Sequence, residues 1–279
     1  MWAEARSAEA SAAAPRARSE MSRRVLTIAV GLPLFLLLLW RGGMPWTLLL
    51  GLLAVGGAYE WVQLSRAAGA LPAPAVALGG TALLFAAAAR RPELVGPALL
   101  AVTVAALLVQ LLPAYRRHAL ANAGATVLGA LYPALFVTLD LLRAPSSGYA
   151  YTLLVVVAVW ASDGAAMIGG RSFGRHTLAP ALSPKKTWEG AVSGLGGAVA
   201  GALAVGWLLD LPLGVAAAAG VVVAVAGLLG DLAESALKRS AGVKDTGTLL
   251  PGHGGILDRF DAMLFAAPAV YLLLRWVIP

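Results

Sequence analysis

Cysteine is absent from this chain of 279 residues, which excludes disulfides, thiolate nucleophiles and cysteine-ligated zinc sites. Charge is also scarce, because Asp, Glu, Lys and Arg make up 13% of the residues, against about 25% in soluble domains. Apolar residues make up 59%, a composition typical of proteins that cross a membrane several times. The connections between the apolar runs are too short to bury a core, so we expect no soluble domain.

Two further absences narrow the function. The net charge is +7, but the cations lie between apolar runs and form no basic stripe interleaved with aromatics, so nucleic acid is not the expected partner. A Walker loop, Gly-x-x-x-x-Gly-Lys-Ser/Thr, is also missing. The first apolar run lacks a small-residue cleavage site and is followed by others, which argues against a cleaved signal peptide.

The chain divides into three parts by composition. Residues 1–20 are mostly Ala, Arg, Ser and Glu without an apolar face, and we expect a disordered, dispensable tail upstream of a start at Met21. Residues 21–150 are expected to form N-terminal transmembrane helices. Residues 151–279 are expected to form a catalytic transmembrane region, because most of the carboxylates lie there.

The apolar runs predict an all-α polytopic membrane protein with nine transmembrane helices. About 20 apolar residues are needed to cross a bilayer. Many of the runs are rich in Gly and Ala, which predicts close packing of helix backbones. The nine predicted spans are 25–40, 45–64, 72–89, 94–114, 121–142, 149–169, 190–209, 212–236 and 262–278.

The distribution of cations predicts the orientation. With the N-terminus inside, 16 of the 21 lysines and arginines fall on the cytoplasmic side and 5 on the other, as the positive-inside rule requires. We therefore expect a multi-pass protein of the cell (inner or plasma) membrane whose polar motifs face the cytoplasm. The five outer cations are Arg41, Arg90, Arg91, Arg143 and Arg275.

Carboxylates gather in the second half of the chain, where eight of the 14 lie between Asp163 and Asp261. Three polar segments contain most of them: 162–176, 183–190 and 230–261. The stretch 235–261 alone holds four cations, a histidine and three carboxylates within 27 residues. In so apolar a chain this density of charge indicates a site for a charged ligand.

Asp231 lies at the end of an apolar run, with Glu234, Ser235 and Lys238 on the same helical face. A carboxylate at that depth is costly unless it is paired or binds a cation. One interpretation is a structural ion pair with Lys238 or Arg239. The other is a hard-metal ligand, for which Mg²⁺ is the natural choice in a chain with no Cys and three His.

Asp258 and Asp261 are spaced i, i+3 before the last span, and Asp258 is a candidate second metal ligand. For Asp261 the alternatives are pairing with Arg259 or Lys238 and compensation of a helix dipole. The preceding segment 252–255, Gly-His-Gly-Gly, would allow a backbone to approach a ligand closely.

The segment 183–190 reads Ser-Pro-Lys-Lys-Thr-Trp-Glu-Gly. Pro184 predicts the first turn of a helix with Ser183 as its N-cap. Lys186 and Thr187 would then lie at the positive end of the helix, which is suited to binding phosphate. The alternative is a helix cap whose lysines only fix topology.

The third segment closely resembles the signature of the phosphatidate cytidylyltransferases, or CDP-diacylglycerol synthases. Eleven specified positions keep their spacing: Ser235, Lys238, Arg239, Lys244, Asp245, His253, Gly254, Gly255, Asp258, Arg259 and Asp261. The segments 183–190 and 163–176 also resemble the family, so the resemblance is specific over 160–261. One departure is Met167, where the family commonly has Tyr.

The resemblance implies an enzyme that makes CDP-diacylglycerol and pyrophosphate from CTP and phosphatidate in the lipid bilayer, as a homodimer. It implies a Mg²⁺-dependent site, with room for a second cation, in which Asp231 and Asp258 hold the metal. Together with the charge pattern it gives three sets of site residues. The catalytic set is Lys238, Arg239, Lys244, Asp245, His253, Arg259 and Asp261; the substrate-binding set is Asp163, Arg171, Ser183, Lys186, Thr187, Gly254 and Gly255; the metal set is Asp231 and Asp258.

Two other functions remain open from the residues. A CTP-dependent lipid kinase would use similar charges but release CDP instead of pyrophosphate. An ion-coupled transporter would place Asp231 and Lys238 along an ion path. Transporters usually carry broken helices in two similar halves, whereas the polarity here is confined to one half of the chain.

Overall fold

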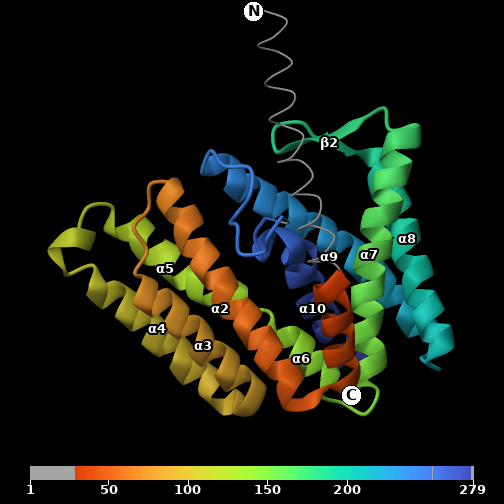
Figure 1. Cartoon of the computed structure of the whole chain (residues 1–279), viewed down its shortest axis with the longest axis horizontal. Coiled ribbons are helices and arrows are strands. Elements are labelled where there is room, and N and C mark those ends of the chain that lie inside the picture. Colours follow the sequence, from red (N-terminus) through yellow and green to blue (C-terminus); the bar gives the residue numbers. More distant parts are fainter. Residues whose placement is uncertain (1–28, 253, 278–279) are drawn as a thin grey trace, which may run out of the picture.

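The computed structural model describes residues 29–252 and 254–277, and the predicted tail at 1–20 lies outside them. The chain is almost entirely helical (Figure 1). The elements in chain order are the helix Ala29–Arg41, α2 (Gly43–Ala67), α3 (Pro74–Arg90), η1 (Pro92–Leu94), α4 (Val95–Val109), η2 (Pro113–Tyr115), α5 (Ala119–Ala134), α6 (Val137–Arg143), α7 (Gly148–Phe173), β1 (Thr177–Ala179), β2 (Ser183–Thr187), α8 (Trp188–Leu208), α9 (Leu213–Ser240) and α10 (Leu257–Val277).

Each predicted span coincides with helix, but the described residues contain seven helices long and apolar enough to cross a membrane. The segments predicted at 25–40 and 72–89 correspond to shorter apolar helices, Ala29–Arg41 and Pro74–Arg90. The segment predicted at 121–142 is interrupted between α5 and α6, just after Pro133. The amide that Pro133 lacks would have bonded to the carbonyl of Gly129, four residues earlier, and Thr81 Oγ1 donates to that carbonyl instead, at 3.1 Å.

Two groups of helices pack side by side (Figure 1). Helices α2 to α5 form one group, and α7 to α10 form the other, with α6 between α2, α7 and α10. The main core runs through the second group and continues into α2 and α6.

Helices α7 and α8 approach closely, as the Gly and Ala content predicts. A Cβ added to Gly197 on α8 would lie 2.5 Å from the carbonyl oxygen of Ala161 on α7. Only glycine therefore allows this backbone contact. Ser162, the next residue of α7, lies against Gly194 of α8 in the same way, since a Cβ added there would lie 3.2 Å from the carbonyl oxygen of Ser162.

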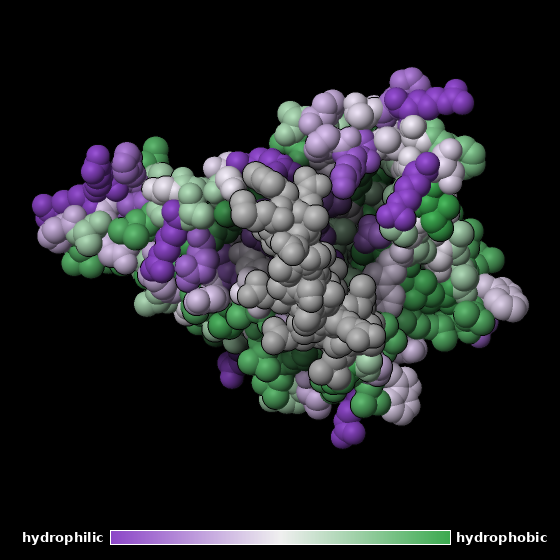
Figure 2. Space-filling model, turned by 45° about the horizontal axis from the view of Figure 1, so that its top comes forward, coloured by the Kyte–Doolittle hydropathy of each residue, from purple (hydrophilic) through white to green (hydrophobic). Residues whose placement is uncertain are grey.

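Hydrophilic side chains gather at one end of the molecule (Figure 2). They lie over the β1–β2 hairpin and over the connection between α4 and α5, whereas hydrophobic side chains dominate the rest of the visible face. A polar end joined to an apolar body is the surface expected of a protein embedded in a bilayer.

Candidate functional site

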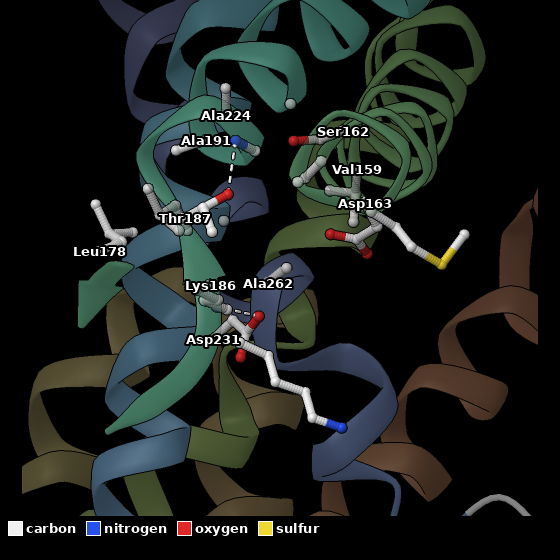
Figure 3. A pocket seen from close by; sticks show the side chains of 18 of the residues that line it. Val159, Ser162, Asp163, Leu178, Lys186, Thr187, Ala191, Ala224, Asp231 and Ala262 are labelled. Atoms are coloured by element: carbon white, nitrogen blue, oxygen red, sulfur yellow. Dashed lines mark hydrogen bonds and ion pairs between the residues drawn. The ribbon is translucent and has the colours of Figure 1, made fainter. Parts of the chain in front are cut away.

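A cavity of about 620 Å³ lies between α7, α8, α9 and the hairpin (Figure 3). Its wall contains members of all three polar segments singled out in the sequence. Five predicted site residues line it: Asp163, Arg171, Lys186, Thr187 and Asp231. The remaining lining is mostly small and apolar, so the cavity offers both charged and hydrophobic surface.

Lys186 and Asp231 form an ion pair across the cavity (Figure 3). Their side chains are 21% and 35% exposed, and the buried part of Lys186 includes its Nζ atom. This partner differs from the ones considered in the sequence, because Asp231 pairs with Lys186 rather than with Lys238 or Arg239. Asp163 faces the same space from α7 (Figure 3), and Asp261 lies near enough for the charges of all three carboxylates to repel one another.

The local structure that aims Lys186 inward is a hairpin, and the prediction of a helix opened by Pro184 was wrong. Residues Ser183–Thr187 form strand β2, which pairs with β1 in antiparallel register. The N-cap of α8 is Thr187 instead of Ser183, and its Oγ1 accepts a hydrogen bond of 3.0 Å from the amide of Gly190. Threonine caps a helix well, and Thr187 directly precedes the apolar run, so the helix starts there.

A second polar cluster lies beside the cavity and is almost closed to solvent. Lys238 Nζ lies 2.9 Å from Glu234 Oε1 and 2.8 Å from Asp258 Oδ1. The other oxygen of Asp258 accepts hydrogen bonds from the amide and hydroxyl of Thr246, at 2.8 and 3.0 Å, and from the amide of Gly255, at 2.9 Å. With four donors and a side chain only 4% exposed, Asp258 ties the loop before α10 to α9.

The other predicted residues lie around these two clusters. Arg239 Nε donates to the carbonyl of Leu182, which joins the end of α9 to the hairpin turn. Lys244 and Asp245 are exposed in the loop, and His253 lies outside the described residues. Met167, the departure from the family pattern, lines the cavity and is 51% exposed.

The donor set fits a hard cation. Asp163 and Asp231 present carboxylate oxygens to the cavity, and Mg²⁺ is commonly held by one or two carboxylates together with substrate phosphates. Within 29–252 and 254–277, no group of three or more His, Asp or Glu side chains is arranged as a complete cage. Such a site would therefore be completed by its phosphate ligand.

Sequence reasoning missed two residues that shape this region. Thr246 is buried and contacts Asp258 with both its amide and its hydroxyl. Glu60 is buried in α2 and accepts hydrogen bonds from the amides of Ile256 and Leu257. A signal for Glu60 existed, since it is the one carboxylate in the predicted span 45–64, and ionisable residues inside spans usually mark function.

Comparison with known proteins identifies the family of this chain. The cytidylyltransferase family matches residues 22–277. Phosphatidate cytidylyltransferase of Synechocystis sp. is 33% identical over 92% of this chain and 98% of its own length. Phosphatidate cytidylyltransferase of Brucella suis is 35% identical over 91% of this chain and 93% of its own. Phosphatidate cytidylyltransferase of Staphylococcus aureus is 44% identical over a shorter stretch, which covers 46% of this chain and 50% of that protein. The resemblance drawn from the sequence is thus confirmed.

Proposed function

This chain belongs to the cytidylyltransferase family, and we propose that it transfers the cytidylyl group of CTP to phosphatidate. The products are CDP-diacylglycerol, a precursor of phospholipids, and pyrophosphate. The observation that carries the proposal is the cavity in which Lys186, Asp231 and Asp163 meet beside an apolar wall. Its charged side chains can bind phosphates or a metal ion, and its apolar side chains can contact the acyl chains of a lipid.

The reaction joins two anions, so neutralisation of charge is the main task of the site. An oxygen of the phosphatidate phosphate attacks the α-phosphorus of CTP, and the bond from that phosphorus to the oxygen that links it to the β-phosphorus breaks, so that this oxygen leaves with pyrophosphate. A phosphate monoester is mostly doubly ionised at neutral pH, because its second pKa is about 6. The nucleophile therefore needs no strong general base.

The cations of the site hold the phosphates in place. Lys186 lies in the cavity wall. Lys238 and Arg239 come from the end of α9, Lys244 from the loop that follows it, and Arg259 from the first turn of α10. Gly254 has a φ of +84°, a left-handed backbone conformation that favours glycine. The segment 252–255 is assigned to shaping the nucleotide end of the site.

Mg²⁺ is the proposed cofactor, and when bound it would neutralise charge on the phosphates and withdraw electrons from phosphorus. Asp231 and Asp163 are the residues of the cavity that would hold it. Asp258 remains the second predicted ligand, although its oxygens already accept four hydrogen bonds or ion-pair contacts. The prediction for Asp258 is tested below through protein stability.

A product assay tests the function. Purified protein in lipid-detergent micelles is given phosphatidate and CTP labelled in the α-phosphate, with and without Mg²⁺. We expect labelled CDP-diacylglycerol and one pyrophosphate per lipid, only when Mg²⁺ is present. In a parallel reaction with diacylglycerol in place of phosphatidate, release of CDP with formation of phosphorylated lipid would instead identify a CTP-dependent kinase. No turnover with either lipid would contradict both functions.

We further propose that the N-terminus and the cavity face the cytoplasm. Support comes from the polar end of the molecule, which contains both the hairpin and the α4–α5 connection (Figure 2). Since the chain has no cysteine, single substitutions provide a labelling test without background. In right-side-out vesicles, Ser146→Cys should react with an impermeant maleimide and Ala181→Cys should react only after lysis. The reverse pattern would contradict the orientation.

Nine spans, residence in the inner membrane and a homodimer are the finer parts of the proposal. The family resemblance implies the dimer. The two short apolar helices would complete nine spans if the bilayer is locally thinner around them. The mass of the protein in nanodiscs, after subtraction of lipid, would test the dimer, and a value of one chain would contradict it.

A further inference from the structure

Glu60 connects the N-terminal helices to the loop that carries the site motif. It lies on α2 and is 1% exposed. Its two carboxylate oxygens accept hydrogen bonds from consecutive amides at the start of α10: Oε1 from Ile256 at 2.9 Å and Oε2 from Leu257 at 3.0 Å. Almost two hundred residues separate the partners, so this contact is formed only in the assembled bundle.

The loop is shaped to accept this carboxylate. A Cβ added to Gly247 would lie 2.6 Å from Glu60 Oε1, and one added to Gly255 would lie 2.7 Å from Oε2. Neither distance is possible without movement of the loop or of Glu60. Two glycines on opposite sides of the loop therefore leave space for one buried side chain. Gly255 was predicted to bind substrate. Its contact with Glu60 is a second reason why a residue with a side chain would not fit there.

The same loop is held from its other side by Asp258. The amide of Gly255 donates to Asp258 Oδ2, while the next two amides donate to Glu60. Three successive amides are thus satisfied by two carboxylates, and Asp258 in turn contacts Lys238 of α9. Backbone donors in this position fix the direction of the chain as α10 begins.

We propose that Glu60 is a positioning residue for cytidylyl transfer, which acts by fixing the loop 246–257 against α9. Glu60 is absent from the cavity wall, so its effect passes through Gly255, Asp258 and Lys238. This inference rests on the proposed function for its kinetic part. Its structural part, the hold on the loop, stands independently and has a separate measurement.

The test compares Glu60→Gln with Glu60→Asp. Glutamine keeps the shape but turns an NH₂ donor toward one of the two amides, whereas aspartate keeps two acceptors on a shorter stem. We expect kcat/KM per folded molecule to fall about 10- to 100-fold in Glu60→Gln, the range found for outer partners of a site, and less in Glu60→Asp. A role in packing alone predicts the opposite order, since glutamine fills the same volume.

Hydrogen exchange gives a readout that needs no turnover. Peptides covering 246–258 should exchange faster in Glu60→Gln, while peptides of α3 and α5 stay as in the parent. Unchanged exchange in the loop would overturn the proposal, even if activity fell. If the parent itself made no CDP-diacylglycerol, the proposed function would fail and the exchange result would still decide whether Glu60 holds the loop.

Two control variants test whether the effect of Glu60→Gln comes from the position of Glu60, from the loss of any carboxylate charge or from a general loss of stability. Glu93→Gln makes the same chemical change at an exposed residue of η1 and should leave kcat/KM and exchange unchanged. Thr81→Val removes buried hydrogen bonds to the carbonyls of Ala77 and Gly129, away from the loop. It should lower the melting temperature without lowering kcat/KM per folded molecule. A loss equal to that of Glu60→Gln would overturn the proposal.

Should Glu60→Gln not fold, Gly247→Ala tests the contact from the loop side, because its Cβ would meet the carboxylate. Gly242→Ala is its counterpart in the same connection, with open space around the added Cβ but a φ of +68°. We expect the loss of activity and faster loop exchange in Gly247→Ala to exceed those in Gly242→Ala. Equal effects would overturn the proposal.

Discussion

Asp231→Asn is expected to lower kcat for CDP-diacylglycerol formation by at least about 10³-fold, the upper range for removal of one electrostatic stabiliser, while the protein stays folded. Asparagine has the same shape as aspartate and α9 continues through this position. The side chain is 35% exposed to the cavity, so the change costs little packing. What disappears is a negative charge at the place proposed for Mg²⁺ and the substrate phosphates.

The alternative for Asp231 is a structural role, now as the partner of Lys186. Under that alternative, Asp231→Asn would lower the melting temperature and leave kcat per folded molecule near the parent value. The double variant Asp231→Asn with Lys186→Gln separates the two further, because removal of both members of a purely structural pair should restore part of the lost melting temperature and leave kcat per folded molecule near the parent value. We expect the double variant to be as inactive as Asp231→Asn.

Asp210→Asn is the matched control for this experiment. Asp210 is exposed in the turn between α8 and α9 and has a φ of 53°. Asparagine tolerates this left-handed conformation as well as aspartate does. The same chemical change at the other end of α9 should therefore alter neither kcat nor melting temperature, and a large effect there would mean that the assay responds to charge at any position.

Hydrophobic runs made the helices predictable, because burial in a bilayer requires long apolar segments and allows few charges. Hydropathy is less informative about where a helix bends. Ala119–Arg143 is long and apolar enough to be one span, as predicted, but Leu135 and Phe136 interrupt the helix within it. The segment predicted at 72–89 is the shorter apolar helix Pro74–Arg90, which has 17 residues.

The convergence of the polar segments was predictable, whereas their local geometry was not. Asp163, Lys186 and Asp231 were chosen as residue types suited to phosphate and metal, and all three line one cavity. The hairpin that presents Lys186 was missed, because Pro184 is equally acceptable in an edge strand and in a first helical turn. The pairing of Ala179 with Ser183 shows that the segment is a strand. A strand of five residues is too short for an alternation of polar and apolar residues to reveal it in the sequence.

Contacts between distant parts of the chain could not be predicted from the sequence. Glu60 and Leu257 are 197 positions apart, and no spacing rule connects them. The sequence predicted Asp258 as a metal ligand, but a position in a motif does not reveal how many hydrogen-bond donors surround the side chain. The sequence indicated that Asp258 matters, and the structure adds a second way in which it does.

Asp258→Asn is expected to abolish CDP-diacylglycerol formation and, unlike Asp231→Asn, to destabilise the fold by about 3–5 kcal/mol, the range for removing one partner of a buried charge pair. Either orientation of the asparagine amide turns an NH₂ donor toward other donors. One orientation faces it toward Lys238 Nζ, and the other faces it toward Thr246 and the amide of Gly255. The loop before α10 then loses its hold on α9.

Melting temperature and activity, each measured with and without Mg²⁺, distinguish the two roles of Asp258. If Asp258 organises the loop, the variant melts lower than the parent by the same amount in both conditions. If it is mainly a metal ligand, as the family resemblance implies, the variant melts like the parent without Mg²⁺ and loses only the stabilisation that Mg²⁺ gives, because an ion that binds the folded state stabilises it by mass action. Four donors around a carboxylate that is 4% exposed favour the first result, and a parent-like melting temperature without Mg²⁺ would contradict it.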